Sequence, residues 1–219
     1  PENYGLYSLA LTVPTFLVPF SDIGISPALT RFSAKLRSEG EERKAASLIK
    51  TGITFKLLTS LLFSALLALF SQDIATRVLK RPGIGLLIRL GSLYLFGQAV
   101  FEAVNSTYVG LDKTEKSGLL MNVQAITKIV ISLLLILLGL GVIGATMGTG
   151  LGFLLASGIG STLLLLRATP NMHRRGHGNN LDFSRCLRLM IAYGKPLYIL
   201  SLLLCFFSQY FFKLKRTFL

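Results

Sequence analysis

The sequence predicts an all-α integral membrane protein with about six transmembrane helices. Hydrophobic residues make up 52% of the 219 residues and charged residues only 15%, whereas about a quarter of a typical soluble domain is charged. The mean hydropathy is +0.62. The net charge of +13 comes from short basic clusters between long apolar runs, a pattern typical of loops beside membrane spans. Because no basic domain is interleaved with aromatic side chains, we expect no nucleic-acid partner.

Six apolar runs are long enough to cross a hydrocarbon layer about 30 Å thick as helices that rise about 1.5 Å per residue. They cover residues 6–29, 48–70, 84–109, 118–138, 142–166 and 190–212. The first run contains Pro14, Pro19 and Pro27 and is predicted to form one kinked helix. A basic loop over residues 31–44 follows it.

The stretch from 118 to 166 is predicted to form a helical hairpin that turns at Gly139-Leu140-Gly141. Its first half contains Lys128, and a lysine at a helix centre costs about 2.5–3.5 kcal/mol on insertion. The thirteen Leu, Ile and Val residues of 118–138 offset that cost with about 4–8 kcal/mol on the same scale. The helix is therefore expected to insert with Lys128 inside the membrane.

The second half of this hairpin carries a ridge of small residues along one helix face. The ridge consists of Gly144, Gly148, Gly152, Ala156 and Gly160, which recur every four residues. Small side chains let helices approach closely in lipid. We therefore predict that this ridge packs against a neighbouring helix.

Lysine and arginine counts predict the orientation. Linkers 31–44, 110–117 and 167–189 contain five, two and five of these residues, whereas linker 71–83 on the opposite side contains three. By the positive-inside rule the first three linkers face the cytoplasm. The predicted localisation is the cell membrane, with several passes and these three linkers in the cytoplasm.

Five polar side chains within the predicted spans lie at similar depths, about 9–16 Å from the cytoplasmic helix ends by rise per residue. They are Lys56, Gln98, Glu102, Gln124 and Lys128. Intramembrane charges usually face a bundle interior or a water-filled cavity. Two interpretations stay open: a cavity in which Lys56 and Lys128 meet an anionic substrate, or a Lys128–Glu102 ion pair that holds two helices together.

Motifs of catalysis are missing from the sequence. It contains no P-loop, nucleophile elbow, zinc-ligand spacing or pair of neighbouring catalytic carboxylates. Cys186 and Cys205 lie in unlike surroundings and indicate neither a disulfide framework nor a metal site. We therefore expect neither an enzyme nor a bound metal or cofactor.

Several segments resemble polysaccharide and oligosaccharide flippases of the multidrug/oligosaccharidyl-lipid/polysaccharide exporter superfamily. They are Tyr4-Gly5-Leu6-Tyr7, Asp22-Ile23-Gly24-Ile25, Arg31-Phe32, the GLDKTEKS segment at 110–117 and the Gly139–Gly144 turn. The resemblance runs through about residue 166. It implies two six-helix lobes around a central cavity, through which lipid-linked sugars move by alternating access.

By this resemblance residues 1–166 hold helices two to six of the first lobe, 167–189 form a basic cytoplasmic linker, and 190–219 form a truncated seventh helix. The chain would then be a fragment without the first helix and the second lobe. The implied partners are membrane lipid and a lipid-linked sugar, with polysaccharide assembly enzymes as further candidates. Alternatives are a cation-coupled drug exporter, a membrane enzyme that acts on lipid-linked sugars, and an inactive fragment.

Overall fold

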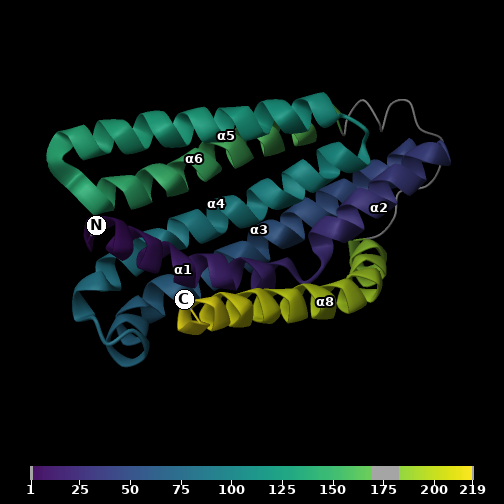
Figure 1. Ribbon diagram of the computed structural model, residues 1–219. Coiled ribbons are helices and arrows are strands. Elements are labelled where there is room, and N and C mark those ends of the chain that lie inside the picture. Colours follow the sequence, from purple (N-terminus) through teal and green to yellow (C-terminus); the bar gives the residue numbers. More distant parts are fainter. Residues whose placement is uncertain (1, 169–182, 219) are drawn as a thin grey trace.

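The computed structural model describes residues 2–168 and 183–218, and this part of the chain is helical without strands. The prediction of an all-α membrane protein is confirmed. The α-helices are α1 (Glu2–Asp22), α2 (Ile25–Ser38), α3 (Glu42–Asp73), α4 (Gly85–Gly110), α5 (Thr114–Leu135), α6 (Gly141–Leu163) and α8 (Phe183–Phe218). The π-helical turns Ile74–Val78, Ile136–Leu140 and Leu164–Ala168 extend α3, α5 and α6 (Figure 1).

Helix α4 lies at the centre of the bundle and packs against α1, α2, α3 and α6 (Figure 1). Within the most apolar 18 residues of α4, 61% of the residues are buried. The corresponding share is 22% for α3 and 11% for the α5–α6 hairpin. These two outer elements expose large apolar side chains such as Leu69, Leu137 and Leu138. Their outer faces are therefore suited to contact lipid.

Helices long and apolar enough to cross a membrane form most of the described chain. Three stretches qualify, namely Glu42–Val78, Gly85–Gly110 and Thr114–Leu166, and the bent pair α1–α2 adds a fourth if it is one span. Thr114–Leu166 folds back on itself where Gly139 and Gly141 adopt φ of 84° and 48°, so it supplies the two antiparallel helices of the predicted hairpin (Figure 1). Five of the six predicted spans fall within these elements, and the sixth lies in α8.

The first predicted span differs from the expectation of one proline-kinked helix. Pro14 and Pro19 lie inside a continuous α1. The chain breaks instead at Ile23 and Gly24, with φ of 47° and 74°, because two successive residues with positive φ cannot continue a right-handed helix. Helices α1 and α2 meet there at a bend of 46°.

The prediction of a loop over residues 31–44 is wrong for most of its length. Helix α2 continues to Ser38, and α3 begins at Glu42. Helix α2 is amphipathic: Ile25, Ala28 and Leu29 are buried, whereas the basic residues beyond them are exposed. One apolar stripe is enough to hold this basic segment as a helix against the bundle.

The α2–α3 and α4–α5 connections lie at the same end of the bundle, opposite the hairpin tip (Figure 1). The Arg37 guanidinium donates to the Leu111 carbonyl and lies 3.8 Å from the Asp112 carboxylate. Burial lowers the pKa of Lys113 beside them, and the charges of Lys116 and Arg37 act in the same direction. Basic side chains from these two connections therefore lie close together at this end. The core of the predicted linker 167–189, residues 169–182, lies outside the described residues.

The small-residue ridge of α6 contacts two helices. A Cβ atom added at Gly152 would lie 2.9 Å from the Lys128 Cβ and 3.0 Å from its Cα, and Gly144 and Gly148 meet α5 in the same way at Leu135 and Ser132. Further along α6, Ala156 is buried in the core. Gly160 faces Val104 of α4 and Leu120 of α5.

Replacing Gly152 by alanine is expected to destabilise the hairpin by about 1–3 kcal/mol, because the new methyl group would overlap the α5 backbone. Gly158 is the matched control, since a Cβ there would meet nothing within 4 Å. Gly158→Ala should be neutral or stabilising, as alanine favours a helix over glycine by roughly 0.5–1 kcal/mol. Thermal unfolding of both variants in detergent measures the difference. Equal effects would show that the close α5–α6 approach does not contribute to stability.

Candidate functional site

A buried ion pair lies at the break between α1 and α2. The Lys56 ammonium on α3 donates to Asp22 Oδ1, the last residue of α1. The Lys56 side chain is 0% exposed and that of Asp22 is 18% exposed. An unpaired ammonium at this depth would be costly, so the pair explains how α3 accommodates a lysine in an apolar run.

The same carboxylate also holds the start of α2. Asp22 Oδ1 accepts hydrogen bonds from the Ser26 backbone N–H at 3.3 Å and from the Ser26 hydroxyl at 2.5 Å. The first N–H groups of a helix lack acceptors within that helix and attract negative charge. Asp22 therefore joins three helices: it ends α1, it accepts hydrogen bonds from the first turn of α2, and it pairs with α3.

A second carboxylate lies nearby on α4. The Gln98 Nε2 group donates to Glu102 Oε1 at 3.1 Å, one helical turn away. Glu102 is within electrostatic range of both Lys56 and Asp22. The other polar atom of the amide, Gln98 Oε1, is buried without a hydrogen-bond partner. Asp22, Lys56, Gln98 and Glu102 together form what we call the polar cluster.

Hydroxyl groups link the helices around this cluster. Tyr7 on α1 and Thr149 on α6 share a hydrogen bond of 3.0 Å, and the Thr15 hydroxyl donates to the Tyr94 oxygen at 3.4 Å. Interhelical hydrogen bonds of this kind contribute about 0.6 kcal/mol each on average in a membrane protein. They position α1 against α4 and α6 without adding charge.

The structure separates the five predicted cavity residues into two groups. It brings Lys56, Gln98 and Glu102 together in the polar cluster. Gln124 and Lys128 are half-buried on α5, and α6 lies between α5 and α4 over much of their length (Figure 1). No ion pair joins Lys128 to Glu102 within the described part of the chain.

Asp22 is the residue of the polar cluster that the sequence reasoning did not place in the site. Its depth in the membrane could have identified it. By rise per residue, Asp22 lies about 10 Å from residue 29, the end of its apolar run, and Lys56 lies about 12 Å from residue 48, the end of the second apolar run. A lysine and an aspartate at matching depths are candidates for pairing. Depth alone could not show that α1 and α3 are adjacent.

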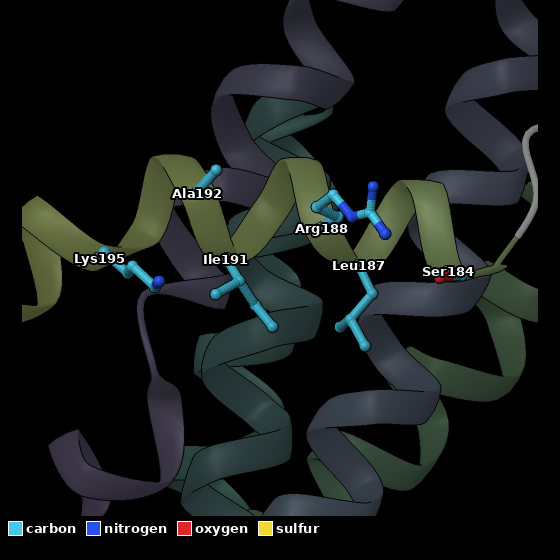
Figure 2. A pocket seen from close by; sticks show the side chains of 6 residues that line it. All are labelled: Ser184, Leu187, Arg188, Ile191, Ala192 and Lys195. Carbon is cyan, nitrogen blue, oxygen red and sulfur yellow. The ribbon is translucent and has the colours of Figure 1, made fainter.

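A shallow recess of about 350 Å³ lies along the first turns of α8, on the surface of the protein. Figure 2 shows the side chains of Leu187 and Ile191 pointing to the same side of the helix. The recess is lined by Ser184, Leu187, Arg188, Ile191, Ala192 and Lys195. Because all six residues belong to one helix, it is a groove on a helix surface, distinct from the polar cluster.

The described residues contain no group of three or more His, Cys, Asp or Glu side chains that could hold a metal ion. Cys186 is buried beside Met190 in the contact between α8 and α2. The chemistry of the candidate site therefore rests on the charges and amide of the polar cluster and on Lys128.

A family model described as polysaccharide biosynthesis protein matches residues 1–212. The chain belongs to this family. The match confirms the family expected from the sequence, and it covers every residue of the polar cluster. Neither the curated proteins nor the solved structures include a significant match. With its apolar helices, this member of the polysaccharide biosynthesis family is a multi-pass membrane protein.

Proposed function

We propose that the protein moves lipid-linked oligosaccharide precursors across the cell membrane by alternating access. Membership of the polysaccharide biosynthesis family supports a transporter, since its members are typically transporters rather than enzymes. The partners in this proposal are membrane lipid and the lipid-linked sugar. In this proposal linkers 31–44, 110–117 and 167–189 face the cytoplasm, as the positive-inside rule predicts.

The observation that carries the proposal is the broken span α1–α2 with a buried ion pair at its break. Discontinuous helices in transporters form binding sites near the middle of the bilayer, where helix ends and freed carbonyl groups meet ligands. Irregular backbone at membrane depth is tolerated where protein or a water-filled cavity surrounds it.

The two lysines inside the predicted spans take different roles in this proposal. The Lys56 charge is neutralised by Asp22, so it holds the broken span in place. Lys128 forms no ion pair among the described residues and is half-buried. With Gln124 one turn away on the same helix face, Lys128 is the cation that meets the pyrophosphate of a lipid-linked sugar.

A flipping assay tests this function. The full chain is reconstituted in liposomes that contain a fluorescent oligosaccharide linked to a polyprenyl pyrophosphate, and a membrane-impermeant quencher reports the fraction in the outer leaflet. We expect faster transbilayer movement than in protein-free liposomes. Lys128→Gln should slow it about tenfold, because a hydrogen bond to a charged group contributes about 1.5 kcal/mol.

Lys50→Gln is the matched control, since Lys50 is an exposed lysine near the start of the apolar part of α3. It should flip the lipid at the unaltered rate. If the unaltered protein moves the lipid no faster than protein-free liposomes do, the proposed function is contradicted. Movement of a lipophilic cation in place of the sugar lipid would favour a drug exporter.

A further inference from the structure

We propose that Glu102 and Gln98 form an exchangeable proton site, in which a protonated carboxyl group and a primary amide face each other and share two hydrogen bonds. The site lies on α4, which has the largest buried share among the three long apolar stretches of the described chain. The ligand is a proton, and the geometry of these two side chains is the basis of the proposal. A role for this proton as the ion coupled to transport rests on the proposed function. The binding of the proton to Glu102 does not.

One half of this pairing is visible in the structure. The Gln98 Nε2 group donates to Glu102 Oε1 at 3.1 Å, while Gln98 Oε1 is buried and has no hydrogen-bond partner. An ionised carboxylate only accepts hydrogen bonds and cannot satisfy that oxygen. A protonated carboxyl group has one O–H donor. With the proton on Oε2, Glu102 can donate to Gln98 Oε1 and complete the pair.

The charges around Glu102 oppose one another: the Lys56 ammonium favours an ionised carboxylate, whereas the Asp22 carboxylate opposes it. Lys56 on α3 and Asp22 at the end of α1 lie within electrostatic range of it, as does Tyr94 on α4 itself. The single ammonium of this set is already bound by Asp22. An ionised Glu102 would therefore place a second negative charge on one shared cation.

Among the described residues, no ion pair joins Glu102 to another helix packed against α4. Helix α6 contains no ionisable side chain between Gly141 and Leu163. The α5 residue Lys128 makes no ion pair with Glu102 among the described residues. The basic residues of α2, including Arg31, Lys35 and Arg37, are exposed beyond its buried face.

Loss of the proton would change the contacts of the broken span. The O–H bond of Glu102 breaks, the proton passes to water, and the carboxylate keeps the electron pair. That carboxylate then competes with Asp22 for the Lys56 ammonium. Since Asp22 also holds the first turn of α2 through Ser26, occupancy of the proton site would be linked to the geometry of the α1–α2 break.

Infrared difference spectroscopy of the purified full chain tests the site directly. The spectrum of the Glu102→Gln variant is subtracted from that of the unaltered protein at neutral pH and again at alkaline pH. We expect the carbonyl stretching band of a protonated carboxyl group in the neutral-pH difference, and its loss at alkaline pH. Gln98→Leu should shift this band, because the amide hydrogen bonds are removed.

Glu115→Gln is the control, because Glu115 is an exposed carboxylate at the start of α5 and should give no such band at neutral pH. Absence of the Glu102 band at neutral pH, or its persistence until the protein unfolds in alkali, would overturn the proposal. The measurement uses no substrate, so a protein that fails the flipping assay can still show the proton site. A protein that flips the lipid but shows no Glu102 band would keep the proposed transport function and exclude the proton site.

Discussion

Replacing Lys56 by methionine is expected to lower the free energy of unfolding by about 3–5 kcal/mol, because removing one partner of a buried ion pair leaves the other charge uncompensated. The Asp22 carboxylate would lose its ammonium partner within the bundle and keep only the Ser26 donors. Methionine has a similar length, so the change is mainly one of charge. Thermal and denaturant unfolding in detergent measure the loss.

The double variant Asp22→Asn, Lys56→Met should recover most of that stability, because it removes both charges. Lys44→Met is the control for loss of a lysine, since Lys44 pairs with Glu41 at 2.6 Å at the partly exposed start of α3. An ion pair of that type contributes about 0–1 kcal/mol. Similar losses for Lys56→Met and Lys44→Met would show that the pair at the break is not a buried, coupled one.

Replacing Gly24 by alanine is expected to displace α8 from the α1–α2 break. Gly24 has a φ of 74°, and a Cβ there would overlap the backbone of Gly194 on α8; a Cβ on Gly194 would in turn lie 2.7 Å from the Gly24 carbonyl oxygen. The left-handed conformation costs alanine about 1–2 kcal/mol. Overlap with a backbone adds about 1–3 kcal/mol, as it cannot be relieved by rotating a side chain.

Gly40→Ala separates these two effects. Gly40 has the same φ of 74°, but a Cβ there would meet nothing within 4 Å. It should therefore show the conformational cost alone. A cysteine cross-link between the surfaces of α2 and α8, or hydrogen exchange over residues 183–200, would report the movement of α8. If Gly24→Ala and Gly40→Ala behave alike, the contact with Gly194 contributes nothing.

Local sequence was enough to predict the spans and the hairpin turn. Apolar length predicted the α4 and α5–α6 boundaries to within a few residues, because hydropathy and helix rise are properties of a continuous segment. Gly139 and Gly141 predicted the reversal, since glycine readily adopts positive φ. The pattern failed at the start of the chain: three prolines suggested a kink, but the break lies at Ile23 and Gly24.

The candidate site was predicted only in part. Lys56, Gln98 and Glu102 were identified by their depth and helix face, and the structure brings them together. Asp22 was not, because its pairing depends on α1 crossing α3, and no local period encodes that crossing. The relation of Lys128 to Glu102 was likewise open, since two residues at one depth can lie on opposite sides of an intervening helix.

The sequence by itself therefore determined that this chain is a helical, multi-pass membrane protein of the polysaccharide biosynthesis family, because composition, apolar length and family motifs are read along the chain. Only the tertiary structure decided which buried charges are paired. It assigned Lys56 to Asp22, left Glu102 beside a half-satisfied amide, and set Lys128 against Gly152. These contacts arise where separate helices meet, and the packing of small residues and the break in the first span determine where that happens.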